Sequence, residues 1–266
     1  MLDRTKFGTL SGWNRVWAVA AIHGEAERLR RMHHQIARLF QPRDRLVYLG
    51  NYLGYGPDIL GTLDELITFR REVLAVPGMM PQDIVFLRGA QEEMWQKLLQ
   101  LQLAMNPRDV FDWMIERGVA ASVTAYGIDP DTGTISARAG AVALTRWTGA
   151  LRDAQRARPG HSHLMTQLRR AAVTEEGSIL FVHAGLDPSR PLETQRDAFW
   201  WNPGGFAAIN EPFGGFRMVV RGFDPGGGGV ALGDHTMTLD AGCGLGGPLF
   251  AVCLDRDINV VEQLEA

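Results

Sequence analysis

Five short apolar runs that each end in a glycine-containing loop limit this chain to folds built on buried strands. The runs cover residues 16–24, 46–51, 84–89, 179–185 and 218–223. Continuous apolar runs of this length are typical of strands that are buried on both faces. Glycine directly after a strand permits a tight turn, or the close approach of another group to the backbone. The sequence therefore predicts a core of doubly covered strands with glycine-containing loops at their ends.

Helical patterns fill the gaps between these runs. Residues 25–40 place Ala26, Leu29, Ile36 and Leu39 on one apolar helix face. Residues 59–73 and 92–105 show the same helical pattern. His33 and His34 lie in the middle of that first helix and are expected at its surface or boundary. Because strands and helices alternate along the chain, the expected fold class is α/β.

The pattern becomes mainly helical between about residues 95 and 172, with breaks at Pro107, Gly118 and Pro159. We interpret this part as a helical insertion, or cap, within a single domain that covers residues 1–266. His161 and His163 follow Pro159-Gly160 and are expected in a loop. Beyond the insertion the tail is rich in strands, at residues 237–239 and 249–254.

Composition excludes several classes of partner. Hydrophobic residues make up 45% of the chain and charged residues 21%, which is ordinary for a soluble globular protein. A formal net charge of -3 gives no reason to expect nucleic acid or an anionic membrane as a partner. We see no targeting segment, and no run approaches the roughly 18 apolar residues that span a bilayer. Cys243 and Cys253 are expected to be reduced and buried, as in a cytoplasmic protein.

Four motifs in the loops that follow the predicted strands carry a family resemblance. They are Gly56-Pro57-Asp58, Phe86-Leu87-Arg88-Gly89, Leu180-Phe181-Val182-His183-Ala184-Gly185 and Leu239-Asp240-Ala241-Gly242. In this order and spacing, the chain resembles the calcineurin-like metallophosphatase superfamily, in particular bacterial Ser/Thr protein phosphatases and diadenosine tetraphosphatases. The resemblance extends from Trp17 to Asp255. It implies a four-layer α/β-β/α sandwich with a helical insertion.

The first family motif has lost its carboxylate. Enzymes of this type use two divalent metal ions about 3.5–4 Å apart, bridged by a carboxylate and a hydroxide. Their first motif is Asp-x-His-Gly, which here reads Ala21-Ile22-His23-Gly24. By the resemblance, His23 keeps its imidazole and Ala21 replaces an anionic oxygen ligand.

The second and third motifs have lost the bridge, the phosphate clamp and the general acid. The second begins Gly-Asp and continues through Asp-Arg-Gly-Pro, and here Asn51 replaces the bridging carboxylate and Tyr55 a phosphate-binding arginine. The third is Gly-Asn-His-Glu, and here Ala90 replaces a ligand and Gln91 the acid. An amide has no proton to give near neutral pH, so Gln91 cannot protonate a leaving group.

The remaining ligand positions are His183, which matches the family, and Phe223, which replaces a histidine. Both negative charges of the ligand set are therefore gone, and with them the electrostatic reason for a dinuclear site. We expect no catalytic residues and no cofactor, or at most one weakly bound divalent metal on His23 and His183. If the resemblance is set aside, His23 is interpreted as a histidine at the start of a helix. His183 is then interpreted as a core residue whose hydrogen bonds are satisfied.

Two arginines suggest an anion-binding crevice. Arg88 matches a phosphate-binding arginine of the family, and Arg221 stands close to a family histidine. Guanidinium groups without nearby carboxylates attract phosphate. Two alternatives stay open: Arg88 is a structural arginine paired with Asp58 or Glu92, or the aromatic rings of Tyr55 and Phe223 fill the vacated crevice.

These changes predict a pseudophosphatase, a non-catalytic protein that binds or regulates an unknown protein partner, in one version a phosphorylated partner. The first rival is a Ser/Thr protein phosphatase with residual activity, or with a metal site relocated among His23, His183, Asp58, Glu92 and His235. The second rival is a structural subunit in which the crevice has no role.

Overall fold

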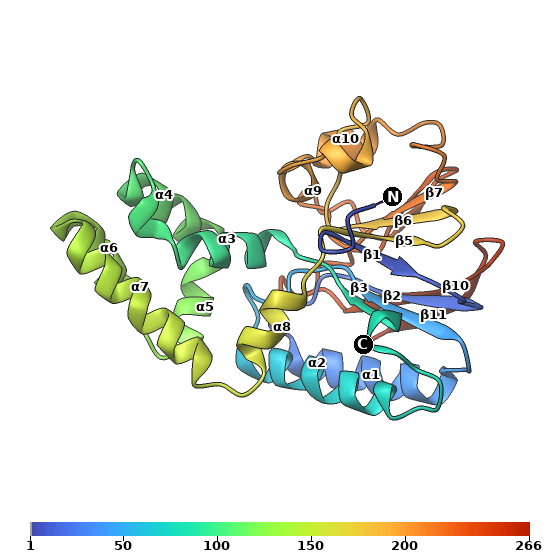
Figure 1. Cartoon of the computed structure of the whole chain (residues 1–266), viewed down its shortest axis with the longest axis horizontal. Helices are drawn as coiled ribbons and strands as arrows, with labels where there is room; N and C mark the ends of the chain where they lie inside the picture. Colours follow the sequence, from blue (N-terminus) through green and yellow to red (C-terminus); the bar gives the residue numbers. More distant parts are fainter. Residues whose placement is uncertain (1) are drawn as a thin grey trace.

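The computed structural model describes residues 2–266, which form two β-sheets packed face to face between layers of helices (Figure 1). The first sheet comprises, in spatial order, β1 (Phe7–Leu10), β5 (Ala171–Thr174), β6 (Ile179–Val182), β7 (Met218–Arg221), β9 (Thr236–Thr238) and β8 (Ala231–Leu232). The second comprises β11 (Val260–Glu265), β10 (Phe250–Asp255), β2 (Arg15–Val19), β3 (Asp44–Tyr48) and β4 (Ile84–Phe86).

Alternating side chains along the strands divide the core into three parts. In β2, Val16 and Ala18 belong to the cluster between the two sheets. Trp17 and Val19 face the other way, into the cluster that helices α1 (Ala26–Leu39) and α2 (Ile59–Leu74) share. The first sheet is covered in the same manner by α9 (Ala198–Trp201) and α10 (Pro203–Ala207). The four-layer α/β architecture is therefore confirmed.

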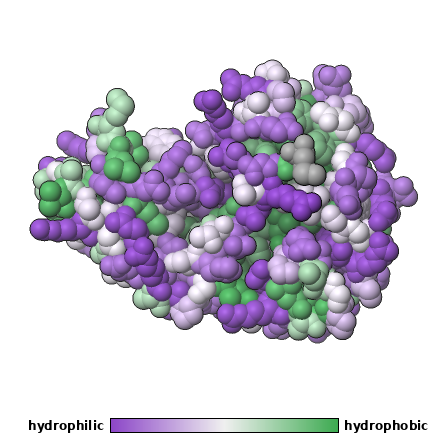
Figure 2. Space-filling model, viewed as in Figure 1, coloured by the Kyte–Doolittle hydropathy of each residue, from purple (hydrophilic) through white to green (hydrophobic). Residues whose placement is uncertain are grey.

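The insertion is a run of short helices that projects from the sandwich on the left of Figure 1. It contains α3 (Ala90–Leu98), η2 (Leu101–Leu103), α4 (Pro107–Met114), the kinked turn η3 (Ile115–Val119), α5 (Ala120–Ala125), α6 (Pro130–Ala139), α7 (Ala141–Arg156) and α8 (His161–Gln167). Large apolar side chains are exposed on it, including Leu103, Met105, Ile135 and Val142. Green apolar surface is visible at its outer end in Figure 2.

Two short turns complete the elements, η1 (Pro81–Asp83) before β4 and η4 (Leu192–Thr194) before α9. None of the helices in residues 2–266 has both the length and the apolar character that crossing a membrane requires. Cys243 and Cys253 are buried free thiols, as predicted.

Several local predictions were wrong. The helix predicted over residues 92–105 ends at Leu98, and a separate turn, η2, follows it. The helical part ends at Gln167, and β5 begins at Ala171, inside the range predicted as insertion. His161 starts α8 and does not lie in a loop. His33 is buried, with 3% of its surface exposed, because it packs against Phe69 beneath the sheet.

The strands β1, β5, β8 and β11 were not predicted. They are short or are edge strands, and their sequences lack the continuous apolar run that marks the central strands.

Candidate functional site

The loops after β2, β3, β4, β6 and β7 meet where the two sheets adjoin, and we call this buried meeting place, which includes His23, Asn51 and His183, the crevice. One backbone contact joins the two sheets, since Ala21 N donates to Gly222 O over 2.9 Å; within the first sheet, Gly222 N donates to His183 O over 3.0 Å. The His183 ring reaches the opposite sheet, where Nδ1 lies 2.7 Å from Leu49 O. The structure therefore brings together the strand-end positions that the sequence singled out.

Two loop residues hold an unusual backbone conformation at the bottom of the crevice. His23 and Asn51 have φ values of 54° and 55°, which non-glycine residues adopt rarely. The backbone N–H groups of Ile22 and His23 both donate to Asn51 O, over 3.1 and 2.6 Å. Strained residues of this kind cluster at functional sites and persist only where surrounding contacts fix them. The loop geometry of a functional site is therefore present.

Gly50 is required for this geometry. Its φ is 94°, and a Cβ on it would lie 2.6 Å from Gly89 N and 2.9 Å from His183 Nδ1. A side chain here would push the loops apart, so the close approach depends on glycine.

Asn51 occupies the position that the resemblance assigns to the bridging carboxylate, and its amide is used within the protein. Its Oδ1 accepts a hydrogen bond from Gln91 N over 2.9 Å. This fixes the amide orientation, so that Nδ2 faces His23 Nε2 at 3.2 Å and donates to it. The lone pair with which His23 would bind a metal is thereby occupied by an N–H group. Asn51 offers a hydrogen-bond donor where a metal site needs an anion.

His183 keeps the arrangement of a metal-binding histidine. Its Nδ1–H donates to Leu49 O, which leaves Nε2 deprotonated. That Nε2 is buried without a hydrogen-bond partner, as is Nδ1 of His23. Buried polar atoms without a hydrogen-bond partner are uncommon in native structures.

Both imidazoles are neutral at physiological pH. Burial lowers the pKa of His23 to about 3, and the neighbouring His183 contributes in the same direction. Burial also lowers the pKa of His183 to about 4. Neutral imidazoles retain lone pairs, so protonation does not prevent them from binding a cation.

Aromatic rings pack directly against these imidazoles. The ring of Phe223 stacks on His183 with centroids 5.3 Å apart and an interplanar angle of 11°. The same ring meets His23 edge-on at 5.4 Å, and Tyr55 lies 5.3 Å from His23 on another side. Two residues that replaced polar family groups therefore cover both imidazoles with apolar surface.

The turn η3 of the insertion contacts the crevice through the backbone carbonyl oxygen of Arg117. Arg117 O accepts a hydrogen bond from the Tyr55 hydroxyl over 3.0 Å and another from Gln91 Nε2 over 2.7 Å. The adjacent Gly118 has a φ of 94°, and a Cβ on it would lie 2.5 Å from the Tyr55 ring. Tyr55 and Gln91, which stand in place of the phosphate clamp and the general acid, thus hold η3 over the crevice.

The carboxylates considered for a relocated metal site have other roles. Glu92 is buried and accepts hydrogen bonds from four backbone N–H groups, those of Asn51, Tyr52, Leu53 and Gly89. Asp58 caps α2 by accepting from Gly61 N over 2.8 Å. His235 lies before β9, at the strand end opposite to the crevice, with Nδ1 3.2 Å from Arg217 O.

Residues 2–266 contain no group of three or more His, Cys, Asp or Glu side chains arranged to hold a metal ion. A dinuclear centre needs a bridging anion and several further donors. The crevice supplies one free imidazole lone pair, on His183, and a second that Asn51 occupies. The residues present do not fit the dinuclear metal centre that the fold implies.

The two candidate anion-binding arginines both have carboxylate partners. Arg88 Nη1 lies 3.1 Å from Glu93 Oε2, so its partner is neither Asp58 nor Glu92. Arg221 Nη2 lies 2.9 Å from Asp224 Oδ2, and its Nε donates to Thr238 Oγ1. The Arg221 guanidinium also lies over the Phe206 ring, 4.3 Å from its centroid. An anion in the crevice would compete with Glu93 and Asp224 for these two groups.

Sequence reasoning missed two parts of the site. One is the carbonyl of Arg117, which no side-chain pattern marks. The other is the turn at residues 242–247: a Cβ on Gly244 would collide with His23, and Cys243 Sγ lies 3.3 Å from Ile22 O. The density of glycine in that turn was the available signal.

Comparison with known proteins bears on the fold. No protein-family model matches the sequence, and no curated protein matches it significantly. Among solved structures, one assigned as a diadenosine tetraphosphatase is 18% identical, with 98% of each chain covered and a TM-score of 0.59.

Two further solved structures are similar. A cold-active protein-tyrosine phosphatase from a psychrophilic Shewanella species is 12% identical, with 100% of this chain and 85% of that chain covered and a TM-score of 0.51. A serine/threonine phosphatase from Saccharomyces cerevisiae is 14% identical, with 98% and 84% covered and a TM-score of 0.50. At these identities the likeness concerns the fold. The chain has the calcineurin-like metallophosphatase fold, as the sequence motifs predicted.

Proposed function

We propose that this protein is a pseudophosphatase, a non-catalytic relative in fold of the metallophosphatases that binds or regulates a protein partner. The observation that carries the proposal is the hydrogen bond from Asn51 Nδ2 to His23 Nε2. This bond occupies the lone pair with which His23 would bind a metal. The N–H donor belongs to Asn51, the residue that would have to bridge the two metal ions. A bridging role needs two anionic oxygens, whereas an amide offers one neutral carbonyl oxygen. In Asn51 that oxygen already accepts from Gln91 N.

The chemistry of phosphoester hydrolysis would also lack its other parts. Gln91 cannot act as a general acid. Tyr55 carries no positive charge for a phosphate, and its hydroxyl is bonded to Arg117 O. Electrostatic stabilisation of the transition state is commonly the largest single contribution to enzymatic rates, so losing the metals and the clamp together removes most of it.

One competing role has a specific observation in its favour. His183 Nε2 is a buried lone pair without a partner, and an imidazole that donates Nδ1–H to a backbone carbonyl is oriented as metal ligands are. A single weakly bound divalent ion would use this lone pair of His183. Rotation of the Asn51 amide would free His23 as its second ligand. This role predicts one ion per chain and not two.

Metal content tests the proposal directly. The protein is purified without chelator, incubated with Mn²⁺, Fe²⁺ or Zn²⁺, desalted and measured by elemental analysis. We expect less than one tightly bound metal per chain, because only one strong lone pair is free. A value near two per chain would overturn the proposal, and a value near one that is lost in His183→Ala would establish the competing role.

An activity assay adds a positive control. We expect no metal-dependent hydrolysis of a generic phosphomonoester above background. The combined variant Ala21→Asp, Asn51→Asp, Ala90→Asn, Gln91→His and Phe223→His restores the ligand set and should bind metal if the loop geometry persists. Turnover is expected to need Tyr55→Arg as well. A robust rate in the natural protein that disappears in His183→Ala contradicts the assignment.

We also propose that any partner recognised in the crevice carries a phosphate group. Arg88 follows β4 and Arg221 ends β7, and both would have to exchange a carboxylate for the ligand. Titration with a phosphopeptide, in parallel for the natural protein and Arg88→Ala, tests this idea. Equal and negligible binding by both proteins would confine the partner to another surface.

A further inference from the structure

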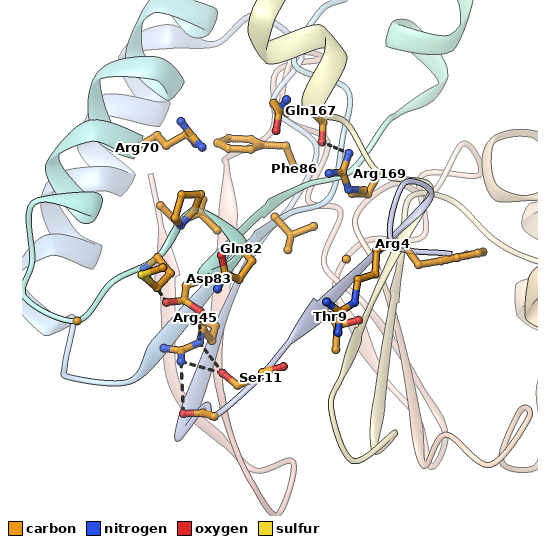
Figure 3. Close-up of a pocket in the computed structure, with 18 residues that line it drawn as sticks. Arg4, Thr9, Ser11, Arg45, Arg70, Gln82, Asp83, Phe86, Gln167 and Arg169 are labelled. Carbon is orange, nitrogen blue, oxygen red and sulfur yellow. Dashed lines mark hydrogen bonds and ion pairs between the residues drawn. The ribbon is translucent and has the colours of Figure 1, made fainter. Parts of the chain in front are cut away.

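A second cavity lies at the open edge of the sandwich, away from the crevice. β1 ends the first sheet and β4 ends the second, and a cavity of about 690 Å³ lies between them (Figure 3). Gly8 and Val85 meet at its floor, where a Cβ on Gly8 would lie 2.7 Å from Val85 Cγ1. No residue that lines this cavity belongs to the set that replaces the family's metal-site residues.

One end of the cavity is closed by backbone. Arg169 N donates to Phe86 O over 2.8 Å, and Arg88 N donates to Arg169 O over 2.7 Å. These bonds bridge the extension of β4 to the segment that enters β5, so the end wall of the cavity is fixed by both sheets. A volume of this size lies in the range of small-molecule sites.

The cavity carries an excess of positive charge. Four arginines line it: Arg4, Arg45, Arg70 and Arg169. Arg45 is paired with Asp83 over 2.9 Å and is largely buried. Among residues 2–266, the other three guanidinium groups make no ion pair with a carboxylate; Arg169 donates to Gln167 O. Three positive charges around one cavity are thus left without balance.

These three guanidinium groups come from separate parts of the chain. Arg4 precedes β1, Arg70 lies on α2 and Arg169 precedes β5. Figure 3 shows Arg70 and Arg169 at one end of the cavity, with Arg4 beside β1, while the Arg45–Asp83 pair lies at the other end. Three cations that line one cavity give it a positive potential, which attracts an anion.

We propose that this cavity binds a small polyvalent oxyanion, an organic phosphate or a polycarboxylate of nucleotide size or less. The planar guanidinium fork pairs with two oxygens of a phosphate or carboxylate at once, and such charge-assisted bonds are the strongest that side chains make. The apolar wall formed by Phe7, Ile84 and Pro81 fits an organic body attached to the anion. The Arg45–Asp83 pair at the far end is held by bonds within the protein, since Arg45 also donates to Ser11 O and Asp44 O.

Binding at this place ties the N-terminal segment to α2 and to the exit of the insertion. The ligand should therefore stabilise the folded protein, because it binds a surface that only the folded chain assembles. This site is independent of the crevice and of the pseudophosphatase assignment.

Titration calorimetry with inorganic pyrophosphate and with citrate, at constant ionic strength, tests the proposal on the full chain. We expect saturable binding of at least one probe at one site per chain, and weaker binding at higher salt. Binding of pyrophosphate alone indicates a phosphate ligand, and binding of citrate alone indicates a polycarboxylate.

Matched variants locate the binding. Arg70→Ala and Arg169→Ala should each weaken the probe by about tenfold or more, since a hydrogen bond to a charged group contributes roughly 1.5–3 kcal/mol. Arg71→Ala removes the same charge from the neighbouring exposed position of α2, which does not line the cavity, and should bind as the natural protein does. Arg169→Lys should recover only part of the affinity, because lysine lacks the fork.

Three results would each overturn the proposal: no saturable binding of either probe, equal losses in Arg70→Ala and Arg71→Ala, or binding that survives the double variant Arg70→Ala/Arg169→Ala. Thermal melting of each variant without probe checks that all of them fold, so loss of binding is distinguishable from loss of structure. Binding of acidic peptides without binding of pyrophosphate or citrate also contradicts it.

Discussion

Four histidines are buried in this protein, and they fall into two pairs with opposite surroundings. His33 of α1 lies between Glu65 Oε1, at 2.6 Å from Nδ1, and the Tyr48 hydroxyl, at 2.8 Å from Nε2. His161 of α8 lies between Asp64 Oδ1 at 3.1 Å and the Tyr126 hydroxyl at 3.0 Å. We call these two the helix-side pair. The crevice pair, His23 and His183, has no carboxylate partner among residues 2–266, and each ring leaves one nitrogen unbonded.

The difference between the two pairs shows how burial alone changes the pKa of an imidazole. Burial lowers the pKa in all four cases, but Glu65 and Asp64 oppose the shift for the helix-side pair. No carboxylate opposes it for the crevice pair, whose pKa values fall to about 3 and about 4. Both helix-side carboxylates are neighbours on α2, so one helix satisfies both histidines. The crevice pair has no such support.

The crevice pair and the helix-side pair should differ most in how the free energy of unfolding responds to acid. A histidine whose pKa is lower in the folded than in the unfolded state favours unfolding once it is protonated. The stability that it contributes is therefore complete above the unfolded value near 6.5 and is lost as the pH falls toward 4. From pH 7 to 4 we expect the free energy of unfolding to fall by roughly 3–6 kcal/mol, mainly through His23 and His183.

Urea unfolding at several pH values measures this dependence. The double variant His23→Gln/His183→Gln should show a much flatter dependence, whereas His34→Gln, at an exposed position, should keep the slope of the natural protein. An imidazole NMR titration of His183 with a midpoint near 6.5 would contradict the interpretation.

Asn51→Asp returns one carboxylate to the crevice pair. Without metal, it removes the donor to His23 and buries a charge, so we expect a loss of roughly 1–3 kcal/mol at neutral pH. It should also raise the pKa of His23, because a carboxylate favours the protonated ring, as it does for His33. Added Zn²⁺ should restore the melting temperature. Asn210→Asp, at an exposed position, serves as the control; if both variants melt alike, the buried amide is unimportant.

Glu65→Gln removes a carboxylate from the helix-side pair. We expect a cost of about 1–2 kcal/mol at pH 7, because a neutral amide oxygen replaces the charged acceptor of the short bond from His33. The hydrogen bond from His33 lowers the pKa of Glu65, so its contribution is present above the unfolded value near 4.5 and disappears as the pH falls further. The difference between Glu65→Gln and the natural protein should therefore shrink in acid. Glu72→Gln, on an exposed part of α2, should change little.

Tyr55→Phe tests the attachment of the insertion and should have the smallest effect. The side chain is 41% exposed, so losing its bond to Arg117 O should cost less than about 1 kcal/mol. Hydrogen exchange should nevertheless become faster in η3. Tyr126→Phe removes the corresponding hydroxyl of the helix-side pair and should affect α8 and not η3. Unchanged exchange in both variants would mean that packing alone holds the insertion.

Much of the framework could be predicted from the sequence, because it depends on local patterns. The strands β2, β3, β4, β6 and β7 follow apolar runs, and α1 and α2 follow helical periodicity. Gly118 and Pro107 mark real breaks in the insertion. The four-residue strands β1 and β5 could not be predicted, since a segment such as Phe7–Leu10 becomes a strand only through pairing with a distant segment.

Partners of polar side chains could not be predicted either. Arg88 was a candidate for Asp58 or Glu92, but the partner is Glu93, the residue directly after Glu92 in α3. Glu92 instead accepts four backbone N–H groups, three of them from the loop after β3. The arginines around the edge cavity are spread over the chain, so nothing in the linear sequence joins them.

The sequence by itself determined which chemical groups this protein can offer: Ala21 and Asn51 exclude the ligand carboxylates whatever the coordinates are. Residue identity is a property of the chain, so a missing charge stays missing in every conformation. The tertiary structure alone decided how the remaining groups are used. Asn51 Nδ2 meets His23 Nε2 because Gln91 N holds the other end of the amide. Hydrogen-bond partners depend on distances of a few tenths of an ångström between distant segments, which only the packed sheets fix.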